Sequence, residues 1–286
     1  MLLSAIIVHY KTLDTLPACL LGLASATAGL EVETVVVDND SRDGVAEWLA
    51  RHSPGTRLLT NTANLGYARG VNRGLADTTG EFVLVMNPDC TLEPDAVQHL
   101  IEHLRAHPRV GIAGPKILNP DGTLEYSARA FPDHSAFLFN RYSLLTRLFP
   151  NNPFSRRYLL TDWDHASVRE VDWLSGACLM ARREAIRQVG PMDERFFMFN
   201  EDVDWCRRMK LAGWTVSYFP AARAVHHVGA SRKRVAARVI VERHRGMIHY
   251  FHKHHPTNPL LSLMADGLIM LRAGVMLTQN ALRPRG

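Results

Sequence analysis

The sequence predicts an α/β protein with a mostly parallel sheet, and three short apolar segments carry that prediction. Residues 3–10, 32–37 and 82–86 are rich in β-branched and aliphatic side chains, and helical patterns separate them. Such runs are typical of parallel strands that helices bury on both faces. With 286 residues and 47% hydrophobic content, the chain can bury one large core, and its 21% charged residues argue against disorder.

Acidic residues follow two of these strand segments. Asp38 comes directly after 32–37, and Asp89 closes an Asn-Pro-Asp turn after 82–86. Ligands of parallel sheets bind beyond the carboxyl ends of the strands, so both acids are candidate site residues. Their alternative role is to cap the next helix or to form a turn.

The turn after the first strand segment lacks the glycine-rich loops that usually bind phosphate. Residues 9–14 are His-Tyr-Lys-Thr-Leu-Asp, where a dinucleotide-binding domain carries G-x-G-x-x-G, and no G-x-x-x-x-G-K-[ST] segment follows. A divalent cation can instead bridge a carboxylate and a diphosphate, since magnesium keeps several waters and needs only one or two protein carboxylates. Asp89 is the natural ligand for such a cation.

The remaining segments divide the chain into a catalytic part, 1–232, and a C-terminal part, 233–286. A strand and turn expected at 111–115 mark the end of a nucleotide-binding half, 1–115. The second half, 116–232, is expected to bind the acceptor substrate. Within it, 119–172 is loop-rich, with a helical pattern only around 136–148, and is expected to supply acceptor-binding loops or a lid. A helix is expected at 203–212.

The C-terminal part is basic and apolar at once. Residues 223–286 hold eleven Lys and Arg against Glu242 and Asp266, yet long apolar runs and the lack of a recognition motif argue against nucleic-acid binding. We expect an amphipathic helix at 236–251 and a nearly apolar one at 260–278. Asp266 and Arg272 are costly in hydrocarbon, so a helix pair lying on an anionic membrane surface is preferred to a spanning helix. Burial in a homodimer interface is the alternative.

Cysteine usage and the N-terminus indicate an intracellular protein. The four cysteines are scattered without a C-x-x-C pair, so neither a zinc site nor a disulfide framework is expected. The first apolar segment has no preceding positive charge, and we expect no signal peptide. The predicted location is the cytoplasm, peripheral on the inner face of the cell membrane.

A series of short segments, in order along the chain, resembles one known family. The segments are His9-Tyr10, Val37 to Ser41, Asn64 to Gly74 with three glycines at four-residue spacing, Asn87-Pro88-Asp89, Trp173-x-x-Gly176-Ala177, Asn200-Glu201-Asp202-x-Asp204 and His226-x-x-Gly229-x-Ser231. They are similar to those of the GT-A inverting glycosyltransferases of family 2, in particular the bacterial rhamnosyltransferase-like branch. The resemblance covers roughly residues 2–255 and implies a Rossmann-like GT-A fold.

The resemblance implies a donor site along the strand ends. Asp38 would contact the nucleoside, and the backbone near His9 and Tyr10 would complete its pocket. Asn64 and Gly66 would open a helix along the nucleotide, where helix-end N–H groups favour phosphate.

The resemblance also implies a cation, Mg²⁺ or Mn²⁺, at Asp89. Asp89 matches the last position of the family's D-x-D motif, whereas Asn87 replaces the first carboxylate, which weakens a two-carboxylate site. His226 matches a position that approaches the metal or the diphosphate, and the adjacent His227 is held in reserve.

Asp202 matches the catalytic base of the family's Glu-Asp motif, with Glu201 beside it. In a single displacement, the base takes the proton of the acceptor hydroxyl while the nucleoside diphosphate leaves from the opposite face through an oxocarbenium-like state, so inversion is expected. Trp173 and Gly176 would lie at the acceptor side.

Each assignment has a structural alternative. Glu201 and Asp204 could be first-turn acids of a helix that Asp202 caps, and the glycines could allow close helix packing. Trp173 and Trp205 could be core aromatics. The histidines at 244, 249, 252, 254 and 255 could form a second metal site, but a solvated or membrane-facing surface is more common for such a helix.

The predicted function is transfer of a sugar, a deoxysugar such as rhamnose, from a dTDP- or UDP-sugar to a polyprenyl-linked saccharide or surface polysaccharide. Two alternatives stay open. A sugar nucleotidyltransferase shares an α/β nucleotide site, but its Gly-rich phosphate loop is missing here. A degenerate sugar-nucleotide-binding scaffold is suggested by Asn87.

Overall fold

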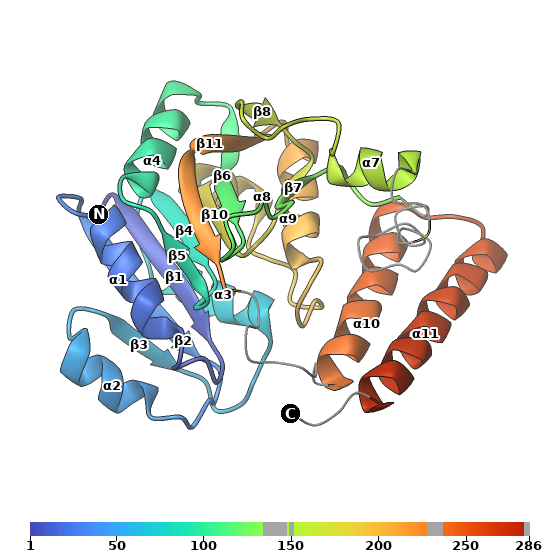
Figure 1. Cartoon of the computed structure of the whole chain (residues 1–286), viewed down its shortest axis with the longest axis horizontal. Coiled ribbons are helices and arrows are strands. Elements are labelled where there is room, and N and C mark those ends of the chain that lie inside the picture. Colours follow the sequence, from blue (N-terminus) through green and yellow to red (C-terminus); the bar gives the residue numbers. More distant parts are fainter. Residues whose placement is uncertain (134–147, 149–151, 228–236, 283–286) are drawn as a thin grey trace.

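The computed structural model describes residues 1–133, 148, 152–227 and 237–282 (Figure 1). A nine-stranded sheet lies at its centre, and strands from both predicted halves of the catalytic part contribute to it. The strand order is β3-β2-β1-β4-β10-β6-β11-β5, and β8 pairs with β11 outside that path.

One end of the sheet is parallel, as predicted. It contains β1 (Leu3–His9), β2 (Val32–Asp38), β3 (Arg57–Thr60) and β4 (Phe82–Met86). All seven residues of β1 are buried, because helices cover both faces of a strand in this position. The register pairs His9 with Asp38, so these two residues lie side by side at the carboxyl edge.

The other end of the sheet is mixed. Strand β10 (Cys178–Arg182) runs antiparallel to both β4 and β6 (Val110–Leu118). Strand β11 (Thr215–His226) runs parallel to β6 and antiparallel to β5 (Cys90–Leu92) and β8 (Arg169–Glu170). A separate ribbon pairs β7 (Ala128–Arg129) with β9 (Trp173–Leu174).

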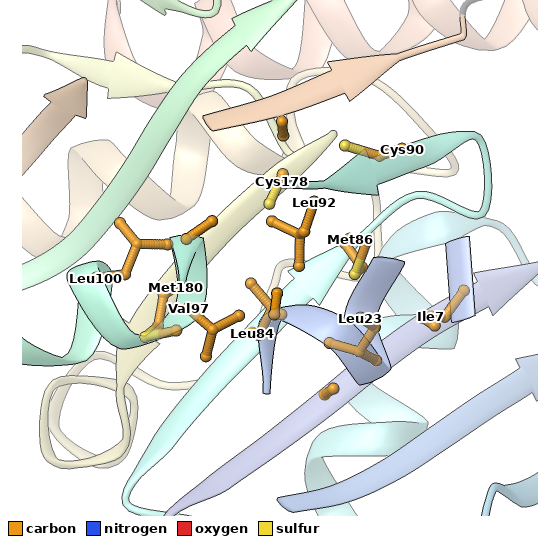
Figure 2. Close-up of a cluster of buried hydrophobic side chains, with 14 of the residues drawn as sticks. Ile7, Leu23, Leu84, Met86, Cys90, Leu92, Val97, Leu100, Cys178 and Met180 are labelled. Carbon is orange, nitrogen blue, oxygen red and sulfur yellow. The ribbon is translucent and has the colours of Figure 1, made fainter. Parts of the chain in front are cut away.

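Two hydrophobic clusters fill the two faces of the sheet. One contains residues of α1 (Leu16–Ala26), α2 (Val45–His52) and α4 (Ala96–Ala106), and Figure 2 shows Leu23, Val97 and Leu100 of these helices against strand side chains. The other contains residues of α3 (Tyr67–Ala76), α8 (Arg183–Val189) and α9 (Glu201–Leu211). Alternation along β1 explains the division, since Ile7 belongs to the first cluster and Ile6 to the second.

Two long helices follow the sheet domain, and Figure 1 shows them side by side, with α11 on the outside. They are α10 (Ala237–His254) and α11 (Pro259–Leu282), close to the predicted 236–251 and 260–278. Tyr250 and Phe251 of α10 enter the second cluster. Two rings of the 196–200 segment also meet α10, because Arg238 lies 4.2 Å from the ring centre of Phe197 and Arg243 the same distance from that of Phe199.

The loop-rich segment 119–172 is more structured than the sequence predicts. It contains β7, α7 (Pro153–Leu159) and β8. These elements are too short for a periodic apolar pattern, which is why they escape prediction. The helical pattern at 136–148 lies outside the described residues, apart from Leu148.

Candidate active site

His9 is held rigidly at the end of β1. Its ring is fully buried, with Nε2 2.9 Å from a carboxylate oxygen of Asp43 and Nδ1 2.9 Å from the hydroxyl of Thr12. The carbonyl oxygen of His9 accepts the N–H of Asn39. The side chain therefore fixes the turn between β1 and α1, and Asp43 ties this turn to the one after β2.

Asp38 is buried at the end of β2 and organises its own turn. Its carboxylate accepts the backbone N–H of Ser41 at 3.0 Å, and the Ser41 hydroxyl accepts the N–H of Lys11 at 3.0 Å. The turn-forming alternative therefore describes what Asp38 does in this structure. Ser41 connects Asp38 to an open cavity of about 840 Å³.

This cavity lies where the sequence predicts the nucleoside pocket. Its lining comes from the turns after β1 and β2, and it is formed by Tyr10, Lys11, Leu13, Asp14, Asp40, Ser41, Arg42 and Asp43. Tyr10 is exposed there. The lining includes neither Asp38 nor the two distant acids Asp89 and Asp202.

Gly66, the N-cap residue of α3, packs closely against the backbone of Phe197 in the segment before α9. Its φ of +92° belongs to glycine, and an added Cβ would lie 2.3 Å from the carbonyl oxygen of Phe197. Asn64 accepts the N–H of Gly66, and the N–H of Tyr67 donates to Phe197 at 2.6 Å. These two amides at the start of α3 are thus already used within the protein and are not available to a phosphate.

Asp89 immediately precedes β5, and its carboxylate faces His226 at the end of β11. Nε2 of His226 lies 3.2 Å from Asp89 Oδ1, and Nδ1 lies 2.9 Å from Oε2 of Glu125. Burial alone would lower the pKa of His226, but its hydrogen bonds to Asp89 and Glu125 raise it to about 10. The side chain of the neighbouring His227 is exposed, so His226 is the histidine that belongs to this group.

The donor set at Asp89 fits a hydrated hard cation with few protein ligands. In the described residues no three His, Cys, Asp or Glu side chains converge on one point. Magnesium accepts one or two carboxylates completed by water and phosphate oxygens, and neighbouring ligands of an octahedral ion at about 2.1 Å lie about 3 Å apart. Asp89 Oδ1 and His226 Nε2, which lie 3.2 Å apart, would hold such a cation, and the cation would supply positive charge at this edge of the sheet. Asn87 stands beside them, half-buried, with its backbone N–H bonded to Ala177.

Asp202 lies in the first turn of α9, where Asn200 is the N-cap residue. One carboxylate oxygen accepts the N–H of Gly176 at 2.9 Å, and the other accepts the N–H of Val203 at 2.8 Å. Burial raises the pKa of Asp202 above 3.8, while these two hydrogen bonds oppose the rise. A carboxylate with a raised pKa and a fixed direction is suited to act as a base.

Glu201 is a buried carboxyl group beside Asp202. Its Oε2 is one of the few buried side-chain oxygens without a hydrogen-bond partner among the described residues. Burial, and then the charge of Asp202, raise the pKa of Glu201 well above 4.5, so this carboxyl group keeps its proton to a higher pH than an ordinary glutamate does. Two adjacent carboxyl groups in different environments can thus hold different charges.

Tyr67 lies close to both Asp89 and the adjacent carboxyl groups of Glu201 and Asp202. Its hydroxyl donates to the carbonyl oxygen of Gly176 at 2.8 Å, and burial followed by the charges of Glu201, Asp202 and Asp89 raises its pKa well above 10. The next residue, Ala177, accepts the N–H of Asn87. The structure therefore brings Asp89 and Asp202 to one region around Tyr67 and segment 176–177.

Several other predicted residues have structural roles. Trp173 is 5% exposed and donates its indole N–H to Ala130 at 2.8 Å, so its ring presents no open face to a sugar. Trp205 is fully buried. Asp204 is fully buried in ion pairs with Arg208 of its own helix and with Lys253 and His254, and the last two pairs join α9 to α10.

The histidines of α10 pair with protein groups and do not form a metal cluster among the described residues. His249, His252 and His254 each contact an aspartate, namely Asp193, Asp266 and Asp204. The prediction that these histidines form a solvated or membrane-facing surface is wrong for His244, which is fully buried.

Sequence reasoning missed Glu125, Tyr67, Asp43 and Arg129. Arg129 stacks on Trp173, 4.9 Å from the ring centre, and its charge lowers the pKa of Asp202 against the effect of burial. Tyr67 lies within a segment that the sequence singled out, so it could have been found there. Glu125 and Arg129 lie in the loop-rich stretch, where no pattern marks a functional residue.

Comparisons with known proteins agree with this architecture. A family model described as Glycosyl transferase family 2 matches residues 4–190. The chain is 34% identical over 278 residues to the N-acetylglucosaminyl-diphospho-decaprenol L-rhamnosyltransferase of Mycobacterium tuberculosis, covering 92% of this chain and 90% of that protein.

Solved structures confirm the predicted GT-A fold. The mannosyltransferase PcManGT from Pyrobaculum calidifontis, in complex with GDP-Man and Mn²⁺, superposes with a TM-score of 0.58 at 19% identity over 98% of this chain and 72% of that one. S. aureus TarS in complex with UDP-GlcNAc gives 0.58 at 16% identity, over 95% and 72%. With the family model and the rhamnosyltransferase likeness, these findings identify the chain as a member of glycosyl transferase family 2.

Proposed function

We propose that this glycosyltransferase moves a deoxysugar such as L-rhamnose from a dTDP- or UDP-sugar to a polyprenyl-diphosphate-linked saccharide, with inversion at the anomeric carbon. The single observation that carries the proposal is the half-buried carboxylate of Asp202, held by the N–H of Gly176 in the same region as Asp89. The donor sugar and the lipid-linked acceptor are supported by the name of the mycobacterial relative.

Asp202 acts as the general base in this proposal. The acceptor hydroxyl donates to the carboxylate oxygen, and its proton passes to Asp202 as the oxygen attacks the anomeric carbon. Such proton transfer contributes about a hundredfold to ten-thousandfold in rate. Burial raises the pKa of Glu201, which disfavours a second negative charge beside an oxygen that must become nucleophilic. The hydrogen bonds from Gly176 and Val203 hold the base in one direction while the acceptor binds.

The donor side combines the β1–β2 cavity with the Asp89 edge. The nucleoside is assigned to the cavity beside Tyr10 and Ser41, which Asp38 and His9 support from behind. Asp89 and Nε2 of His226 would hold Mg²⁺ or Mn²⁺, which supplies positive charge to the leaving diphosphate. Asn87 can contribute an amide oxygen at the same edge.

A direct assay tests the proposal. The purified protein is incubated with a panel of nucleotide sugars, Mg²⁺ or Mn²⁺ and a polyprenyl-diphosphate-linked N-acetylglucosamine, and both nucleotide release and the glycosylated lipid are measured. We expect transfer from dTDP-rhamnose, with the anomeric configuration of the product inverted by NMR. Donor binding without turnover under all conditions would favour a sugar-nucleotide-binding scaffold instead.

The C-terminal part, 233–286, is proposed to place the catalytic part, 1–232, on the cytoplasmic face of the membrane. Helix α11 is long and apolar enough to cross a bilayer, and only 11% of its most apolar window is buried. Two of its charged side chains are turned toward the protein, since Asp266 pairs with His252 of α10 at 2.9 Å and Arg272 is half-buried. The outer face carries exposed apolar residues, Leu260, Leu261, Leu263, Met264, Leu268, Met270, Leu271 and Val275.

This distribution favours a helix lying in the membrane surface. An interfacial helix buries one apolar face in the headgroup and acyl boundary while its polar face stays with the protein. A spanning helix would have to bring Asp266 and Arg272 into hydrocarbon. Arg245, which is exposed on α10, would attract anionic lipid headgroups. A second copy of the chain is the competing occupant of the apolar face.

A further inference from the structure

The carboxylate of Glu125 forms a buried pair with the ring of His226, and the catalytic scheme above gives Glu125 no role. Nδ1 of His226 lies 2.9 Å from Oε2 of Glu125, and the side chains are only 10% and 9% exposed. The two residues are 101 positions apart in the sequence. On the opposite edge of the same ring, Nε2 faces Asp89.

The backbone around Glu125 is fixed independently of this contact. Its N–H donates to Ile117 at 2.9 Å, its carbonyl oxygen accepts the N–H of Ser127 at 2.7 Å, and Leu118 bridges to Leu124. The carboxylate is therefore carried by a tight turn at the end of β6. His226 is equally fixed, because it ends β11 and pairs with Cys90 of β5.

An ionised carboxylate can only accept hydrogen bonds, and this determines which ring nitrogen can bind a cation. The Glu125 carboxylate requires a proton on Nδ1 of His226. The lone pair available to a cation is then on Nε2, which already points at Asp89. Histidines that bind metals commonly donate their other N–H to a carboxylate in this way, and the partner sets the tautomer and the orientation of the ring.

We propose that Glu125 is a positioning residue of the cation site: by accepting Nδ1–H it presents Nε2 of His226 to a divalent cation shared with Asp89. This rests on the proposed function, because the cation and its ligand Asp89 are part of it. Glu125 touches neither the cation nor the donor and acts only through His226. Glu125 also brings a negative charge to the site. In the family's D-x-D motif this charge comes from the first aspartate, whose position is occupied by Asn87 in this chain.

Metal affinity separates this role from a purely structural one. The dissociation constant of Mn²⁺ is measured by electron paramagnetic resonance in the presence of dTDP, with correction for Mn²⁺ bound to free dTDP. The compared proteins are the full-length chain and its Glu125→Ala, Glu125→Gln, Asp121→Asn and Asp89→Asn variants. Asp121 lies on the same turn and is exposed, and among the described residues its side chain accepts hydrogen bonds from Thr123 alone, so it is the matched control.

We expect Glu125→Ala to weaken Mn²⁺ binding about a hundredfold and Glu125→Gln about tenfold, the range known for partners of metal-ligating histidines. The glutamine keeps an oxygen that can accept Nδ1–H but loses the charge, so it should restore part of the affinity. Asp121→Asn should leave the affinity unchanged.

The outcomes distinguish the inference from the proposed function. If Asp89→Asn removes Mn²⁺ binding while both Glu125 variants stay within twofold of the parent protein, the positioning role is wrong and the cation site stands. If Asp89→Asn has no effect, the cation site itself is wrong. Should Glu125→Ala fail to fold, the isosteric Glu125→Gln decides the question, since thermal unfolding will show whether it keeps the parent stability.

Discussion

The carboxylate of Asp202 accepts the backbone N–H of Gly176 at 2.9 Å, and so joins the first turn of α9 to the segment before β10. The same glycine accepts the hydroxyl of Tyr67 from α3. The backbone of Gly176 thus binds side chains from both α9 and α3 and aligns these helices around the proposed base. An added Cβ at Gly176 would lie 3.5 Å from Asp202 Cβ, an ordinary contact, so the backbone groups and not the missing side chain are what the site requires here.

Asp202→Asn should lower the rate of transfer about a hundredfold to ten-thousandfold, because the amide cannot take the proton of the acceptor hydroxyl. Donor binding should change little, since Asp202 lies away from the nucleoside cavity. Steady-state kinetics and calorimetry with the donor nucleotide measure the two effects. Full turnover in the variant would show that another group is the base.

Activity of the parent enzyme should fall as the pH is lowered through a pKa above that of an ordinary aspartate. Burial raises the pKa of Asp202 above 3.8, and the base works only when it is ionised. A profile of kcat against pH gives the apparent pKa of the catalytic group. A profile that stays flat down to pH 4 would contradict this prediction.

Glu201→Gln should stabilise the protein at neutral and alkaline pH. The folded protein holds the proton of Glu201 well above 4.5, whereas the unfolded chain releases it near 4.5. The unfolded state therefore binds fewer protons, and the free energy of unfolding of the parent protein falls as the pH rises above 4.5. Glutamine resembles the neutral acid in shape and removes this loss. Thermal unfolding of both proteins from pH 5 to 9 tests it, and an equal dependence on pH in the two would refute it.

Asp204→Asn should destabilise the fold by about 3–5 kcal/mol, because it leaves Arg208, Lys253 and His254 without their buried partner. Burial opposes ionisation of Asp204, but hydrogen bonds from His254 and Lys253 lower its pKa to about 2. Its contribution is therefore complete above pH 3.8 and is lost as the pH falls toward 2. Urea unfolding measures the loss. The exposed pair of Asp162 with Arg156 is the control, and Asp162→Asn should cost about 0–1 kcal/mol.

Gly66→Ala should destabilise the protein by more than about 1–3 kcal/mol. The φ of +92° and ψ of 176° at Gly66 belong to a backbone region that is nearly restricted to glycine, and the new Cβ would also meet the Phe197 carbonyl. Gly122 has a φ of +80°, and a Cβ added there would have nothing within 4 Å, so Gly122→Ala introduces only the backbone strain. Urea unfolding of both variants should therefore show the larger loss for Gly66→Ala; equal losses would mean that the Phe197 contact adds nothing.

Removal of residues 256–286 should move the protein from membrane to soluble fractions. Replacing Leu260, Leu263 and Leu271 by Gln should have the same effect while leaving the polar contacts of α11 in place. Flotation with vesicles that contain anionic lipid measures the binding, and Leu21→Gln, on the exposed side of α1, is the control. Unchanged flotation would exclude the membrane surface. If the leucine variant instead converts a dimer to a monomer in solution, a second copy covers the helix.

Local patterns in the sequence were sufficient for β1, β2 and β4 at the parallel end of the sheet, whereas the four-residue β3 was not predicted. The strands β1, β2 and β4 are rich in β-branched and aliphatic side chains. The rule that such sheets bind ligands at their carboxyl edge then marks the acids that follow β2 and β4 as candidate site residues. The extents of α10 and α11 were also close, since long amphipathic or apolar stretches are visible in one dimension. The antiparallel β10 was not predicted, because its five residues are too short to distinguish a strand from a buried helical turn.

The sequence by itself determined the α/β class, the family resemblance and the acids proposed for the site. Only the tertiary structure decided that His226 is paired with Glu125, that Glu201 has a buried oxygen without a partner, and that Trp173 is part of the packing. Chain patterning records which face of a segment is apolar. The protonation state, tautomer and exposure of a side chain depend instead on contacts between residues as far as a hundred positions apart in the sequence. Those contacts form only when the chain folds.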